Sequence, residues 1–271
     1  MVRSLWTAAT GMIAQQTNVD TIANNLANVN TVGYKAEVAE FKSLLYQTLQ
    51  AKTTSANGEE KPIGAQVGLG VRNSAITSIF KDGNIYQSEN DFAFALSGKG
   101  FFAVKGEDDN TYYTRNGNFG IAISNNGLAL TDSDGRPVLD TNGKEIVFNK
   151  NLVATDIVVD EEGAFHYPDK DGKLQPLNVT IGVYQFNNPA GLDKMGDSLY
   201  AQTNASGEVI NEAKAKDITK SKLMHGYLEG SSVQVADEMV NLIVAQRAYE
   251  MNSKAIQASD EMLQQANQLR R

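Results

Sequence analysis

The amino-acid sequence predicts an α+β protein in which long terminal helices form a coiled-coil-like domain and the central region is antiparallel and β-rich. Apolar residues recur at every seventh position near both ends of the chain, the spacing that draws one narrow apolar seam along a helix. From about residue 92 the pattern changes to alternation, and Asn-Gly and Asp-Gly pairs follow at short intervals. This second pattern is typical of consecutive β-hairpins.

The C-terminal helix is expected over residues 231–271, a stretch that contains neither glycine nor proline. Ser231 and Gln234 have the spacing of a capping box, and Asp237 and Glu238 suit the positive N-terminus of a helix. Such a helix would span roughly 50–60 Å, more than a compact domain of this chain length can cover. Its seam therefore needs partner helices. The seam residues are Val235, Leu242, Tyr249, Ile256 and Leu263.

The N-terminal helix carries a matching seam within the first thirty residues. Gly33 stands where a helix C-cap would adopt a left-handed conformation. Beyond it, residues 34–50 have apolar side chains at helical spacing, so the sequence predicts that helix resumes there. The seam residues are Leu5, Met12, Val19 and Leu26.

Two arrangements of these seams fit the periodicity: an intramolecular hairpin or dimeric coiled coil, and a higher-order assembly of many copies. Asn24, Asn25 and Asn28 crowd one end of the first helix. Amides can bond to neighbouring chains without the desolvation cost of charges, but a solvated helix end explains them equally well. The expected assembly residues are the two seams together with Met239 and these three asparagines.

Four segments are expected along the chain. They are a helical segment at 1–45, an extended connector at 46–72, a β-rich domain at 73–224, and a helical segment at 225–271 that pairs with the first. Within the β-rich domain, the short β-prone runs between turn dipeptides predict strands and hairpins.

Composition excludes several classes of function. A net charge of −8 argues against nucleic acid or an anionic membrane as partner. No run approaches eighteen apolar residues, so no membrane insertion is expected. The pattern after Arg3 is amphipathic, which is unlike a cleaved signal peptide. Without cysteine, neither disulfides nor thiolate chemistry can contribute.

No catalytic, cofactor-binding or metal site is expected. The chain has two histidines, His166 and His225, and nothing in the sequence places a third group beside either. Gly98-Lys99-Gly100 leads into an apolar strand pattern and lacks the spacing of a phosphate-binding loop, so a turn at a strand edge explains it better. The rival class is an enzyme or carbohydrate-binding module carried on a coiled-coil oligomeriser, which glycan affinity or turnover would support.

Several motifs resemble those of one known family. Residues 24–35 (NNLANVNTVGYK) resemble the N-terminal signature of the bacterial flagellar rod and hook axial proteins, and EMVN at 238–241 with QRAYE at 246–250 resembles the C-terminal signature. GFF at 100–102, YTRNGNF at 113–119 and GYLEGSSV at 226–233 resemble the β region of that family. The resemblance covers nearly the whole chain.

The resemblance implies a structural subunit that polymerises into a hollow helical shaft and transmits torque. Both terminal helices would line its core, with the β domain outside. LLYQTL at 44–49 and the following polar stretch to Pro62 resemble the insertion typical of distal rod subunits. A proximal rod or short hook-type subunit is the alternative. Implied partners are further copies, proximal rod and hook subunits, the rings around the rod, and the flagellar type III export apparatus. The implied location is the basal-body rod in the periplasm.

Overall fold

The computed structural model divides into two compact units. The helical unit consists of Met1–Ala27, Glu37–Ser78 and Gln234–Arg271, and the β unit of Asn28–Ala36 and Ile79–Val233. The chain thus passes from one unit to the other more than once. The residues that the structure describes are 2–50, 64–124, 127–149, 157–160, 163–168, 174–215 and 218–269.

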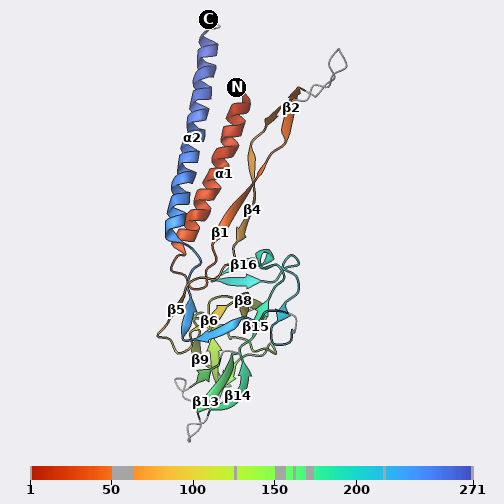
Figure 1. The fold of residues 1–271 in the computed structure, drawn as a ribbon, viewed down its shortest axis with the longest axis vertical. Helices are drawn as coiled ribbons and strands as arrows, with labels where there is room; N and C mark the ends of the chain where they lie inside the picture. Colours follow the sequence, from red (N-terminus) through yellow and green to blue (C-terminus); the bar gives the residue numbers. More distant parts are fainter. Residues whose placement is uncertain are drawn as a thin grey trace. The chain divides into compact units, whose positions relative to one another are not determined.

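The helical unit contains the two long helices, α1 (Val2–Ala27) and α2 (Val235–Gln268). They pack side by side and run in opposite directions, so that the two chain ends lie at the same end of the pair (Figure 1). The expectation of a long helix at each end is confirmed. The C-terminal helix begins at Val235, four residues later than expected.

A β-ribbon accompanies the helices within this unit. Its first part pairs β1 (Glu37–Ser43) with β4 (Val71–Ser78), and both strands contact α1. The second part pairs β2 (Tyr46–Gln50) with β3 (Ala65–Gly68). The connector expected at 46–72 is therefore a pair of strands where it is described, and residues 51–63 lie outside the described part of the chain.

The helix expected over residues 34–50 is wrong. Phe41, Leu44, Leu45 and Leu49 fit a helical spacing, but β1 pairs along its whole length with β4, about thirty residues later in the chain. Strand preference depends mainly on such neighbours, which local periodicity does not reveal.

Two expected caps are also absent. Gln234 caps α2 without a side-chain hydrogen bond, and the Ser231 hydroxyl instead accepts a hydrogen bond from the N–H of Val233 at 3.3 Å. Gly33 has a φ of +69°, but α1 has already ended at Ala27. A Cβ at Gly33 would lie 2.6 Å from the carbonyl carbon of Arg115. This glycine serves a close backbone approach within the β unit.

The β unit is antiparallel throughout its named strand pairs, as the turn spacing predicts. Its largest sheet has six strands in the order β16-β17-β8-β7-β15-β18, and two three-stranded sheets follow the orders β11-β10-β9 and β12-β13-β14. β6 pairs with β19, and β5 pairs with β20. The bounds are β5 Ile85–Gln87, β6 Phe94–Ser97, β7 Phe101–Lys105, β8 Thr111–Thr114, β9 Gly120–Ser124, β10 Gly127–Thr131, β11 Val147–Phe148, β12 Val158–Val159, β13 Ala164–Pro168, β14 Leu174–Thr180, β15 Val183–Gln185, the 3-10 helix η2 Pro189–Gly191, β16 Asp193–Gly196, β17 Leu199–Ala201, β18 Ile210–Asn211, β19 Lys222–His225 and β20 Tyr227–Glu229.

Strand β7 explains how the core of this unit is built. Phe102 and Val104 pack into one buried cluster, while Phe101 and Ala103 pack into a second. Successive side chains of a strand point to opposite faces, so both faces of the sheet are covered here. A strand buried on both sides needs apolar residues at every position, which accounts for the continuous run Phe-Phe-Ala-Val.

Candidate assembly surface

Small and polar residues fix the register of the two helices. The Ser4 and Ser259 hydroxyls are 3.1 Å apart, and the Asn25 amide donates to Glu238 Oε1 at 3.2 Å. Between these pairs, a Cβ added to Gly11 would lie 2.9 Å from Asn252 Nδ2. From one contact to the next, the position on α1 rises by seven residues or a multiple of seven, and the position on α2 falls by the same number. The heptad spacing therefore places small or polar layers where the backbones approach closely.

The two helices that carry the predicted seams pack against each other within one chain, as the hairpin alternative expects. Leu5, Met12, Val19 and Leu26 are half-buried, as are Leu242, Ile256 and Leu263. Val235 and Tyr249 are 41% and 42% exposed. The seam is thus partly covered within one subunit, with Val235 and Tyr249 its most exposed members.

The three candidate asparagines differ in how much of each side chain is exposed. Asn25 is only 1% exposed. Its amide nitrogen donates to the Glu37 carbonyl at 2.8 Å, and its amide oxygen accepts from the Glu37 N–H at 2.8 Å. It therefore joins α1 to β1 within one chain and has no surface to offer a neighbour. Asn24 is exposed, and Asn28 is half-buried, its amide oxygen accepting from the Thr31 hydroxyl at 3.1 Å.

A face of α2 that the seam does not include carries the most exposed of the large apolar residues of the helix. Met239, Val240, Ile243, Val244 and Met251, here called the outer α2 face, are each more than half exposed. Residues four apart share one side of a helix, and at 3.6 residues per turn all five positions fall within about 140° of its circumference. Single exposed apolar residues are ordinary, whereas a contiguous group marks an interaction site. Sequence reasoning found Met239 and missed the other four because they lie outside the heptad rows.

Two further apolar groups are exposed in the helical unit. On α1, Trp6 and Ile13 stand seven residues apart and are 69% and 63% exposed. On the ribbon, Leu45, Tyr46 and Leu49 are exposed, and every residue of β2 is exposed. An isolated two-stranded ribbon is marginally stable in water, and its free edges can pair with another chain.

The β unit contains a buried cluster of charges that sequence reasoning missed. Lys35 Nζ lies 2.6 Å from Glu229 Oε1, and Arg115 NH1 lies 3.2 Å from Glu229 Oε2. The Lys35 ammonium also donates to the Lys81 carbonyl, and the Gly83 N–H donates to Glu229 Oε1. Each charge is thereby paired and hydrogen-bonded, as buried charges require. Burial lowers the pKa of Lys35, Arg115 lowers it further, and Glu229 opposes both effects.

Backbone bonds run alongside this cluster. The Gly33 N–H donates to the Glu229 carbonyl at 2.8 Å, and the Ser232 N–H donates to the Tyr34 carbonyl at 3.0 Å. The Ala36 N–H donates to the Ser232 hydroxyl at 2.9 Å. The segment that follows α1 in sequence is therefore bonded to the segment that precedes α2. The charge cluster locks this junction from inside the β unit.

The described residues assemble no catalytic constellation. His166 Nδ1 is 3.1 Å from the Ala164 carbonyl, and His225 Nε2 is 2.6 Å from the Asp91 carbonyl. Among the same residues, no three histidine or acidic side chains are grouped as a metal site would need. The two α-helices of the described chain fall short of the combination of length and hydropathy that a membrane crossing takes.

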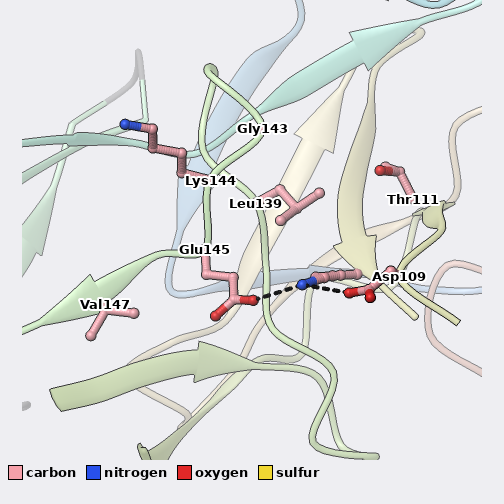
Figure 2. Close-up of a pocket in the computed structure, with 8 residues that line it drawn as sticks. Asp109, Thr111, Leu139, Gly143, Lys144, Glu145 and Val147 are labelled. Carbon is pink, nitrogen blue, oxygen red and sulfur yellow. Dashed lines mark hydrogen bonds and ion pairs between the residues drawn. The ribbon is translucent and has the colours of Figure 1, made fainter. Parts of the chain in front are cut away.

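A surface cavity of about 420 Å³ is lined by a group of three charged side chains, in which two carboxylates pair with one ammonium group (Figure 2). Dashed lines run from Asp109 and Glu145 to one ammonium nitrogen, that of Lys105, at 2.8 and 3.2 Å. Hydrogen bonding to Asp109 is the main cause that raises the pKa of Lys105. These are surface ion pairs, which contribute little to stability.

Three family models match the chain. The one described as "Flagella basal body rod protein" matches residues 5–35, "Flagellar hook protein FlgE/F/G D1 domain" matches 95–167, and "Flagellar basal body rod FlgEFG protein C-terminal" matches 224–269. Lys35, Arg115 and Glu229 come from three different matched segments.

Full-length relatives decide the family. The chain is 42% identical over 273 residues to the "Flagellar basal-body rod protein FlgG" of Borreliella burgdorferi, and the alignment covers 100% of both chains. This chain belongs to the flagellar basal-body rod protein family. It is also 40% identical to the proteins of the same name from Buchnera aphidicola subsp. Schizaphis graminum and Caulobacter vibrioides, over 99% of this chain and 100% of each relative. The resemblance inferred from the terminal and central motifs is confirmed.

Proposed function

We propose that this chain is a structural subunit of the distal flagellar rod and that it polymerises through its helical unit into a shaft that transmits torque to the hook. The observation that carries the proposal is the outer α2 face. Five apolar side chains of one helix stand in solvent in a chain whose full-length relatives are named as basal-body rod proteins. Covering them requires other chains.

The contacts between copies differ from those that periodicity alone suggests. The half-buried seam holds α1 against α2 and sets the shape of the hairpin. Val240, Ile243 and Val244 face away from it and supply the contact with neighbours, to which Trp6 and Ile13 on α1 add. Val235, Met239 and Tyr249 remain candidates from the expected set because each is more than 40% exposed.

Repetition of one contact around an axis gives an open tube. A heterologous contact, in which a surface of one copy meets a different surface of the next, continues without closing when its rotation does not close a ring. The exposed ribbon adds contact area through Leu45, Tyr46 and Leu49. Many lateral contacts per subunit give the stiffness that torque transmission needs.

The remaining partners follow from the position of such a subunit in the shaft. Proximal rod subunits would lie on one side and hook subunits on the other, with the surrounding rings outside. The flagellar type III export apparatus would deliver the chain without a cleaved signal peptide.

The test replaces Val240 and Ile243 by Asp in the full chain. We expect both variants to keep their helical circular dichroism, to lose tube formation in electron micrographs at rising protein concentration, and to fail to restore motility to a strain that lacks this chain. Gln257→Asp is the matched control, since Gln257 is an exposed polar residue on the same helix. Tubes and motility in the two Asp variants equal to the control would reject the proposal.

A further inference from the structure

A cleft in the β unit is lined by three lysines. The cleft has a volume of about 620 Å³, and its lining includes Lys99, Lys220 and Lys222 together with Asp82. The lysines are exposed, and none of their ammonium groups forms an ion pair within the described part of the chain. In a protein of net charge −8, this is a local concentration of positive charge.

A buried carboxylate holds one wall of the cleft in place. Glu212 is only 4% exposed and accepts hydrogen bonds from the Ser221 N–H at 2.7 Å and from the Gln185 amide at 2.8 Å. The same Gln185 amide donates to the Thr219 carbonyl at 2.8 Å. The segment that presents Lys220 and Lys222 is therefore fixed by a network and is not a loose loop.

A neighbouring part of the lining depends on glycines. A Cβ on Gly98 or Gly100 would lie 2.8 Å from the Ser221 hydroxyl oxygen, and the Gly100 N–H donates to that oxygen at 2.8 Å. The Gly-Lys-Gly turn can thus approach Ser221 closely and present Lys99 beside the other two lysines. Two carboxylates stand at the cleft, Asp82, which lies 3.8 Å from Arg115 and accepts from the Gly98 N–H at 3.2 Å, and the buried Glu212. The three lysines outnumber them, so the cleft keeps a positive excess.

Three ammonium groups carried by a fixed backbone attract carboxylates, and the chain carries a matching element elsewhere. Glu107, Asp108 and Asp109 form the exposed turn between β7 and β8, which the Gly106 N–H closes by donating to the Asn110 carbonyl at 2.8 Å. Figure 2 shows Asp109 engaged with the Lys105 ammonium. Within the described chain, neither Glu107 nor Asp108 forms an ion pair.

We propose that this lysine cleft receives the Glu107–Asp109 turn of a neighbouring copy, so that β units contact one another in the shaft. The proposal rests on the polymerisation proposed above. Each copy carries one cleft and one turn, so the contact is heterologous and repeats along an open assembly. Opposite charges across a contact guide association and register. Salt screens exposed charges, so the contribution of this contact falls as ionic strength rises.

A charge-reversal cycle in the full chain tests this contact. We expect Lys220→Glu/Lys222→Glu and Glu107→Lys/Asp108→Lys each to raise the protein concentration required for tube formation by about tenfold or more at low salt. Combining the four substitutions restores the pairing with exchanged signs and should return this concentration to within about threefold of the unmodified chain. Lys194→Glu, at an exposed lysine of β16 that lines neither this cleft nor the cavity beside Asp109, is the charge control and should have little effect.

The outcomes distinguish the two proposals. Tubes from the unmodified chain and equally from both reversed variants overturn the cleft contact and leave polymerisation standing. An impaired cleft variant that the reversed turn does not rescue assigns the cleft to another acidic partner and also overturns the contact. An unmodified chain that forms no tubes and restores no motility overturns polymerisation and this contact together. Circular dichroism of each variant establishes that folding is retained.

Discussion

Lys35 Nζ and Glu229 Oε1 lie 2.6 Å apart with both side chains excluded from water, although 194 residues separate them in the sequence. Lys35 stands in the segment that follows α1, and Glu229 ends the last strand before α2. The pair and its partner Arg115 therefore connect both passages of the chain toward the helices to the core of the β unit. In the proposed shaft, this junction would keep those two passages from separating.

The first prediction concerns this junction. Glu229→Gln keeps the shape of the side chain but removes the only buried carboxylate that pairs with Lys35 and Arg115 in the described chain, leaving Arg115 with the more distant Asp82 carboxylate at 3.8 Å. Breaking a buried ion pair in this way costs about 3–5 kcal/mol, and we expect the β unit to lose that much stability. Chemical denaturation followed by near-ultraviolet circular dichroism, which reports the buried aromatic residues, measures it.

Its control is Glu250→Gln, which removes the exposed ion pair between Glu250 and Arg247. Exposed pairs contribute about 0–1 kcal/mol, so this variant should be almost as stable as the unmodified chain. Similar small losses in both variants would contradict the role assigned to Glu229.

The second prediction concerns Asn25, which sequence reasoning assigned to contacts between copies. Asn25→Ala leaves the half-buried Glu37 N–H and carbonyl without this partner. Each unsatisfied buried group costs about 1–3 kcal/mol, so the helical unit should unfold at lower denaturant concentration even when dilute. Circular dichroism at 222 nm follows the unfolding. Gln16→Ala, at an exposed residue of α1, is the control. A dilute Asn25→Ala monomer as stable as this control would return Asn25 to the list of intersubunit contacts.

The terminal helices could be predicted from the sequence because their signal is local. Leu5 to Leu26 and Val235 to Leu263 repeat every seventh residue, and that period is visible without any knowledge of the fold. The seven-residue period does not show which chain covers the seam. A partner helix in the same chain and a partner helix in a neighbouring chain give the same sequence pattern.

The remaining features depend on distant parts of the chain. The run from Phe41 to Leu49 fits a helix until β4 supplies a pairing partner. Lys35, Arg115 and Glu229 each look like an isolated surface charge in sequence, and only the fold brings them together. The sequence feature that could have pointed to this buried cluster is that each of the three charged residues stands inside a motif otherwise rich in glycine, small and apolar residues.

The third prediction uses the pH dependence of stability. Burial raises the pKa of Tyr113 to about 12, and the nearby Tyr184 contributes. An unfolded tyrosine ionises near pH 10, so between about pH 10 and 12 the folded state binds more protons than the unfolded state. The stability contributed by neutral Tyr113 is therefore fully present below pH 10 and is lost as the pH rises through 12, by about 1.4 kcal/mol per unit.

Tyr113→Phe should flatten this fall in denaturation curves measured from pH 9 to 12. Tyr46→Phe, at an exposed ring in the other unit, should leave the slope unchanged.

The last prediction separates the seam of the hairpin from its outer face. Leu242 is half-buried on α2, which packs along α1, whereas Val240, two residues earlier, is 60% exposed. Leu242→Asp places a charge in the helix pair, so we expect it to lower the denaturation midpoint of the dilute monomer and, as a consequence, to prevent assembly. Val240→Asp should leave the free energy of unfolding within about 0.5 kcal/mol of that of the unmodified chain, as surface substitutions do, and should block only assembly.

Trp6, the one tryptophan, stands 69% exposed on α1, so its fluorescence should shift to the blue on assembly of the unmodified chain and stay unshifted in both variants. If Val240→Asp destabilised the dilute monomer as much as Leu242→Asp, the outer α2 face would belong to the interior of a single subunit, and the contact between copies would have to lie elsewhere.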